Sequence, residues 1–129
     1  LRAGGRALVL DTDWDSVVWN VADRERHARV MAAWEEHLAH PRLPRVLAGH
    51  LRRAGFAVLA QRVVPLFNPA LHGDTYSADI MELIASFVPG RRDVTAADAQ
   101  AWLADLRARA EEDEYLFSLN RYVALAQAA

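Results

Sequence analysis

The stretch that decides the fold is LRAGGRALVLDTDWD, residues 1–15. It joins a Gly4-Gly5 turn to the largely apolar run Arg6–Leu10, which is rich in strand-forming residues and lacks polar alternation. Such a run is typical of a parallel strand that is buried on both faces of an α/β sheet. Three aspartates follow it directly, at the end of the strand where open α/β sheets bind their ligands. We therefore expect an α/β fold with a site after this strand.

Outward from this stretch, the chain alternates helical and strand patterns. Apolar spacing predicts helices from about residue 23 to the region before Pro41 and at 43–54, 78–88 and 95–110, and strands at 56–64 and 115–125. Pro65 is expected to end the first of these strands. Asp23 and Thr95 are predicted N-capping residues, and Gly55 is the predicted stop of the second helix. With 129 residues, the chain fits one domain.

Composition excludes several kinds of site. All 15 basic residues are arginines, so lysine Schiff-base and P-loop chemistry is excluded, and the absence of cysteine excludes disulfides and thiolate zinc sites. The formal net charge of -2 argues against a nucleic-acid partner. No apolar run approaches the ~20 residues of a membrane span, and the N-terminus lacks a signal-peptide pattern. We expect a cytoplasmic protein without a membrane partner.

Three segments resemble the carboxyl half of class I S-adenosylmethionine-dependent methyltransferases. They are residues 1–11, residues 51–56 (Leu-Arg-Arg-Ala-Gly-Phe) and residues 117–122 (Phe-Ser-Leu-Asn-Arg-Tyr). In that family a Leu-x-Pro-Gly-Gly turn leads into the fifth strand, and Ala-Gly-Phe leads from a helix into the sixth. Here Ala3 stands in place of the proline. The chain is most similar to small-molecule enzymes of the quinone-biosynthesis and arsenite-methylating kind.

The resemblance implies an α/β fold in which the chain is the C-terminal portion, residues 1–129, of one Rossmann-like methyltransferase domain. It would supply strands five, six and seven, with the last strand antiparallel and inserted between the other two, and a helical substrate lid at about 69–112. The implied cofactor is S-adenosylmethionine. The family's glycine-rich loop and ribose-binding acid have no counterpart here, so no cofactor-binding residue is assigned. The strand at 6–10 would lack its neighbour, strand four, and we expect association with an N-terminal half or with a second copy.

The implied function is binding of a small, apolar methyl acceptor. We assign substrate binding to Asp13, Trp14 and Trp19 at the strand end, Asn68 and Tyr76 in a loop, and Phe87 on the lid. Two tryptophans near a strand end suit an apolar pocket, and core packing is an equal alternative for them. We assign no catalytic residue; His72, in the predicted loop, is a weak candidate for removing a substrate proton.

Two alternatives stay open. The first is a non-catalytic truncated or split subunit that acts by association. As a minor alternative, Asp11, Asp13 and Asp15 resemble the nucleophile motif of haloacid dehalogenase-like phosphatases, although Trp14 and Asp15 replace its small residue and threonine. A calcium loop is disfavoured because Ser16 stands at the glycine position. The five histidines lack metal-ligand spacing, so we predict no metal site.

Overall fold

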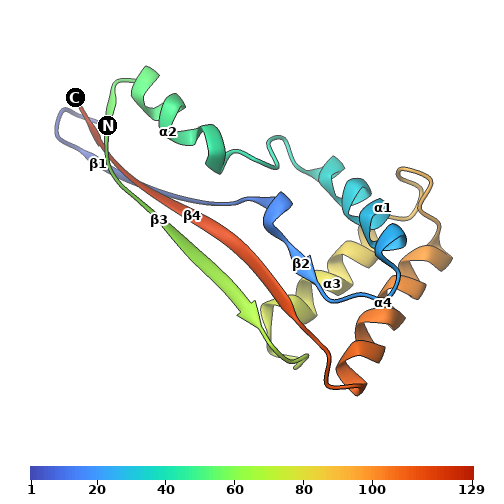
Figure 1. Ribbon diagram of the computed structural model, residues 1–129. Helices are drawn as coiled ribbons and strands as arrows, with labels where there is room; N and C mark the ends of the chain where they lie inside the picture. The colour runs from blue at the N-terminus through green and yellow to red at the C-terminus, as the bar shows by residue number, and fades with distance from the viewer. The chain divides into compact units, whose positions relative to one another are not determined.

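The computed structural model describes all residues, 1–129, and divides the chain into two compact units (Figure 1). Unit 1 comprises residues 1–17, 40–66 and 119–129, and unit 2 comprises residues 18–39 and 67–118. In chain order the elements are β1 (Arg6–Thr12), the 3₁₀ turn η1 (Trp14–Ser16), β2 (Val18–Trp19), α1 (Arg24–Trp34), the 3₁₀ turn η2 (Glu35–His37), α2 (Pro44–Arg53), β3 (Phe56–Asn68), α3 (Tyr76–Phe87), α4 (Ala96–Glu111) and β4 (Phe117–Ala128).

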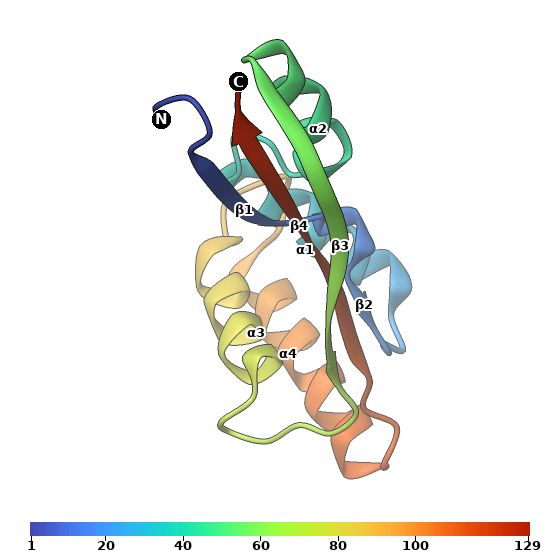
Figure 2. The same ribbon diagram turned by 90° about the vertical axis from the view of Figure 1, so that its left-hand side faces the viewer.

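The sheet has four strands, and each of the other three pairs with β4. Thr12 and Arg6 of β1 lie opposite Arg121 and Gln127, and β2 pairs antiparallel with the first two residues of β4. Figure 2 shows β4 between β1 and β3, running opposite to both. The expected insertion of the last strand between the other two, antiparallel to them, is therefore confirmed. The chain is an α/β protein with an antiparallel sheet and four α-helices.

The prediction that the first strand is a parallel strand buried on both faces is wrong. β1 pairs only with β4, and that pairing is antiparallel. Leu8 is 67% exposed and Leu10 is 48% exposed, because one face of β1 has no cover. Some of the apolar side chains of this strand therefore lie on a face of the sheet that no other element covers.

In unit 1, α2 lies along one face of the strands (Figure 1). Ala124 and Ala126 of β4 are buried, and their small side chains suit close approach of a helix. The predicted helix stop is confirmed, since Gly55 follows α2 with a φ of +85°, a conformation that glycine adopts without a steric penalty.

The expectation that Pro65 ends the strand predicted at 56–64 is wrong, because β3 continues to Asn68. β3 pairs with β4 only, so it is an edge strand. A proline lacks the backbone N–H, and an edge strand can place that missing donor on its unpaired side.

In unit 2, α1, α3 and α4 pack against one another, and Trp19 of β2 packs against His27 of α1 and Trp102 of α4. The fully or almost fully buried residues of this unit include Val30, Trp34, Ile84, Trp102, Leu106 and Phe117. Asp23 caps α1 by accepting a hydrogen bond from Arg26 N–H, as predicted, but the helix ends at Trp34 instead of continuing toward Pro41. The last strand runs from Phe117 to Ala128, so it begins two residues later and ends three residues later than predicted. None of the helices combines the length and the apolar character that a membrane span requires.

The predicted cap of α4 is a complete capping box. Thr95 Oγ1 accepts a hydrogen bond from Asp98 N at 3.0 Å, and the Asp98 carboxylate accepts one from Thr95 N at 3.0 Å. The hydrogen bonds that the Thr95 backbone N–H and hydroxyl donate to the Asp98 carboxylate lower the pKa of Asp98. Both partners are local in sequence, which is why the pattern could be recognised without the structure.

We predict that Thr95→Ala lowers the free energy of unfolding by about 1 kcal/mol, because the first turn of α4 loses its side-chain acceptor. Ser86→Ala is the matched control, since Ser86 is exposed on α3 and its hydroxyl bonds only to the Leu83 carbonyl. Urea unfolding followed by circular dichroism measures both. Equal losses in the two variants would contradict a specific role for the capping box.

Candidate functional site

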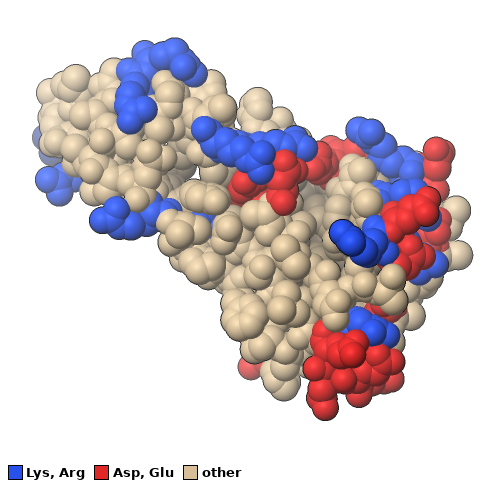
Figure 3. All heavy atoms as spheres, viewed as in Figure 1, with Lys and Arg blue, Asp and Glu red and all other residues tan.

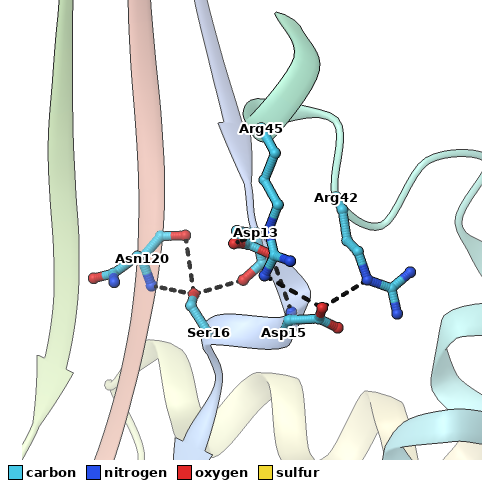
Figure 4. Close-up of polar contacts among 6 residues, drawn as sticks. All are labelled: Asp13, Asp15, Ser16, Arg42, Arg45 and Asn120. Carbon is cyan, nitrogen blue, oxygen red and sulfur yellow. Dashed lines mark hydrogen bonds and ion pairs between the residues drawn. The ribbon is translucent and has the colours of Figure 1, made fainter.

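The first predicted site residue, Asp13, lies in the turn after β1. Its carboxylate accepts a hydrogen bond from Asp15 N at 3.2 Å and so caps η1. Arg45 of α2 donates to both carboxylate oxygens, from Nε at 2.9 Å and from Nη2 at 3.1 Å (Figure 4). Asp13 is only 5% exposed, and a carboxylate at that burial is stable only when it is paired.

The neighbours of Asp13 extend this network. Arg42 Nε donates to Asp15 Oδ2 at 2.6 Å, and Arg45 Nη2 lies 3.2 Å from the same oxygen. The Ser16 hydroxyl donates to the Asp13 carbonyl and accepts from Asn120 N at 2.9 Å, as Figure 4 shows. The turn is thus tied both to α2 and to β4. The hydrogen bond with Asp13 raises the pKa of Arg45.

This arrangement gives no support to phosphatase chemistry. Asp13, at the acid–base position of that motif, is held by Arg45, and Asp15 stands where the motif has a threonine and is held by Arg42. Asp11, at the nucleophile position, accepts a hydrogen bond from Thr12 N at 2.7 Å. No group of three or more His, Asp or Glu side chains is placed to hold a metal ion. Trp14, between them, is half-buried and its backbone N–H donates to the Pro41 carbonyl at 3.1 Å. The network therefore acts as a structural clamp on the turn that carries Asp13 and Trp14.

In unit 2, a buried chain of hydrogen bonds joins two of the predicted residues. Trp19 Nε1–H donates to Tyr115 Oη at 3.1 Å, and Tyr115 Oη–H donates to Ser77 Oγ at 2.8 Å. The Ser77 backbone N–H donates to Asn68 Oδ1 at 3.1 Å. Asn68, predicted in a loop, is the last residue of β3, so this chain connects β2, β3, α3 and the segment just before β4.

Aromatic rings bring a third predicted residue to the same place. The Phe117 ring lies 4.7 Å from Trp19 and 5.9 Å from Tyr76, between centroids. Trp19 is 4% exposed and also packs edge-on against Trp102 at 5.4 Å. Tyr76, predicted in the loop, is the first residue of α3 and stays exposed. The structure thus brings Trp19, Asn68 and Tyr76 together around a core of aromatic side chains.

Phe87 does not join this group. It is the last residue of α3, eleven positions after Tyr76 and therefore about 16 Å along the helix axis. Its ring packs edge-on against Trp34 at 5.5 Å, and the Arg91 guanidinium lies 3.8 Å from its centroid. These contacts give Phe87 a packing role at the far end of the helix.

A surface hollow of about 540 Å³ adjoins Trp19 and Tyr115. Its lining residues are Val18, Trp19, Asn20, Asp113, Glu114, Tyr115 and Leu116. The volume is within the range of small-molecule sites, and apolar walls with a few polar groups are the usual lining of such sites. Figure 3 shows acidic side chains gathered at the end of α4, next to this hollow. Arg109 neutralises part of that charge, by ion pairs with Glu112 at 2.8 Å and Glu114 at 2.7 Å.

Sequence reasoning missed several residues of these networks, above all Arg45, Tyr115 and Ser77. Each acts through a contact that is remote in sequence, such as the 96 positions between Trp19 and Tyr115. Ser77 is a polar residue among apolar helix positions, and a buried polar side chain needs a hydrogen-bond partner, so it was the one residue whose role the local sequence could have indicated. His72, the weak proton-transfer candidate, is exposed and lines a smaller hollow of about 280 Å³ on α3 and α4.

Comparison with protein-family models and with curated proteins finds no match for this chain.

We predict that Tyr115→Phe lowers the free energy of unfolding by about 1–3 kcal/mol, because the buried Trp19 N–H loses its acceptor. Tyr122→Phe is the matched control, a tyrosine of β4 whose hydroxyl takes part in no hydrogen bond. Chemical unfolding gives the stability, and tryptophan fluorescence reports the local change. A loss below about 0.5 kcal/mol in Tyr115→Phe would contradict a structural role of the hydrogen-bond chain.

We also predict that stability falls as the pH drops below 6.5 because of His27. Its Nδ1 accepts a hydrogen bond from Trp102 Nε1 at 3.0 Å, so the bond requires a neutral ring. Burial lowers the pKa of His27 from its ordinary 6.5, against an opposing effect of Asp105. The unfolded chain therefore binds a proton first, and acid favours unfolding.

Unfolding in urea at pH 7.5 and pH 5.5 tests this. His27→Asn removes the titration and should flatten the slope of stability against pH in this range, whereas His72→Asn, an exposed control, should leave it unchanged. An unaltered slope in His27→Asn would assign the pH dependence to other groups.

Proposed function

We propose that the chain is the substrate-binding part of a S-adenosylmethionine-dependent methyltransferase that acts on a small, apolar molecule. The observation that carries the proposal is the order β1–β4–β3, with the last strand antiparallel in the middle. This is the order of strands five, seven and six that the resemblance implies. The Gly4-Gly5 turn before β1 and the Ala54-Gly55-Phe56 entry into β3 lie where that order requires them.

The residues present do not form a site for the cofactor. No glycine-rich loop follows a strand, and β1 ends in a turn whose carboxylates are held by Arg42 and Arg45. A side chain at Gly5 would meet the Arg2 carbonyl at 2.8 Å, so this turn is closed on itself. We therefore place no reaction step at the cofactor on this chain.

The hollow beside Trp19 supports the substrate side of the proposal. Methyl transfer from an activated sulfonium needs a protein to align the acceptor and exclude water rather than to supply a nucleophile. Trp19 and Leu116 give the hollow an apolar wall, and Asn20 and Glu114 give it polar atoms. The acidic rim favours a neutral or cationic molecule over an anion.

The proposal is tested by methyl transfer with the protein expressed from its complete reading frame. Radiolabelled S-adenosylmethionine and a panel of neutral and cationic small molecules are the substrates, and label in an organic-extractable product is the readout. We expect Val18→Glu, at the wall of the hollow, to raise the KM for the acceptor roughly tenfold, because a charge replaces apolar surface.

Val63→Glu is the matched control, since Val63 is an equally exposed strand valine on β3 that does not line the hollow. It should change the KM less than about twofold. No labelled product from any acceptor would contradict the methyltransferase proposal, and equal effects of the two variants would contradict the hollow as the acceptor site. For the chain alone we expect no calorimetric binding of S-adenosylmethionine, and a micromolar Kd, about -8 kcal/mol, would contradict the missing cofactor site.

A second candidate is a non-catalytic subunit that acts by association. The exposed Leu8 and Leu10 on the uncovered face of β1 favour it, because strand edges with apolar side chains are templates for pairing. No phosphatase function is proposed.

A further inference from the structure

The second edge of β1 is open. β1 pairs with β4 on one side and with no strand on the other. The strand carries none of the usual protections of an edge, such as a proline, a bulge or a charged residue in its middle, since residues 7–10 are Ala-Leu-Val-Leu. An edge of this kind invites a further strand.

Hydrogen bonds fix which backbone groups of β1 point to this edge. Asp13 N–H donates to the Asn120 carbonyl at 3.1 Å, and Ala128 N–H donates to the Gly5 carbonyl at 2.8 Å. Extending the register of β1 and β4 by one residue at each end pairs Asp13 with Asn120 and Gly5 with Ala128, so the odd-numbered residues of β1 turn their backbone groups toward β4. In an antiparallel pair this direction alternates along the strand.

The even-numbered residues therefore offer their N–H and C=O groups to the open edge. These residues are Arg6, Leu8, Leu10 and Thr12. Thr12 N–H is already bound by Asp11 Oδ1 at 2.7 Å. The donors and acceptors of Leu8 and Leu10 lie at the middle of the edge, beside the same exposed leucine side chains.

We propose that this edge pairs antiparallel with β1 of a second copy of the chain, so that two sheets join into one. The inference rests on the second candidate function and names its partner. A two-fold axis through Val9 places Leu8 opposite Leu10 of the second copy and Val9 opposite its own counterpart. In this register every outward-facing residue meets another outward-facing residue, so the free donors and acceptors pair with one another.

Side chains support the same register. Leu8 and Leu10 lie opposite Leu125 and Val123 within the chain, so the pairing creates two apolar rows that run across both copies. Cross-strand apolar pairs of this kind stabilise sheets. Arg6 lies opposite Thr12 of the second copy in this register, whereas an in-register parallel arrangement would put the two Arg6 side chains next to each other.

The register makes a test by disulfide trapping possible, because the natural chain contains no cysteine. In Val9→Cys the two thiols would face each other across a non-hydrogen-bonded pair, where Cα atoms are about 4.5 Å apart, within the range of a disulfide. Oxidised glutathione accepts the two electrons and two protons that the thiols lose. Ala7→Cys is the matched control on the same face of β1, and its two thiols would lie four residues apart, about 13 Å.

We expect Val9→Cys, and not Ala7→Cys, to give a covalent dimer on a non-reducing gel. Sedimentation equilibrium of the natural chain should show its average mass rising across the micromolar range, and Leu8→Lys should raise the dimer Kd roughly tenfold or more. Leu59→Lys, an exposed leucine on β3, should leave the Kd unchanged.

A natural chain that stays monomeric throughout this range would overturn the proposal, as would equal trapping of the two cysteine variants. A monomer that still forms labelled product in the methyl-transfer assay would leave the proposed function standing, so the two failures are distinguishable. A dimer that is weakened equally by Leu8→Lys and Leu59→Lys would place the contact on the sheet face and refute the edge pairing.

Discussion

The structure depends on one strand, β4. All other strands pair with it, and it takes part in the cores of both units. Phe117 at its start is fully buried among the aromatic rings of unit 2, and Ala124 and Ala126 near its end are buried in unit 1. β4 has twelve residues and lies at the end of the sequence, so its pairing partners are segments far away in sequence. Without it, β1, β2 and β3 would have no strand to pair with.

The features that could be predicted from the sequence are those with local causes. Asp23 and Thr95 meet partners three residues away, and Gly55 ends a helix through its own backbone conformation. The order of helices and strands follows from apolar spacing, and the middle position of the last strand came from the resemblance. The prediction that β1 is buried on both faces is wrong because a run of apolar residues does not show whether another element covers it.

The candidate site could be predicted only in part. Asp13 was placed after the first strand from its position alone, but its pairing with Arg45 bridges 32 positions and leaves no pattern in the sequence. Trp19 was expected either in a pocket or in the core. It is in the core, held by Tyr115, and its strand β2 has only two residues, too few for a periodic signal. The lining of the 540 Å³ hollow includes Asp113, whose φ of +57° is uncommon for residues other than glycine, although aspartate adopts it more often than most.

Charge is distributed unevenly between the two units, which the chain-wide value of -2 conceals. Unit 1 contains Arg2, Arg6, Arg42, Arg45, Arg52, Arg53, Arg62 and Arg121 against Asp11, Asp13 and Asp15. Unit 2 contains the other seven arginines and fourteen carboxylates. The argument against a polyanionic partner therefore holds for the whole chain and is weaker for unit 1, where the carboxylates of Asp13 and Asp15 are already paired with Arg42 and Arg45.

The open edge of β1 links the two functions that we propose. In the arrangement that the methyltransferase resemblance implies, this edge belongs to strand four of a cofactor-binding half, which would lie parallel to β1. In the association that we infer, the same backbone groups of Leu8 and Leu10 belong to an antiparallel second copy. One edge can accept only one strand, so the two assemblies exclude each other at this place. The direction of the strand that occupies the edge, parallel or antiparallel, therefore separates a substrate-binding half of an enzyme from a subunit that pairs with itself.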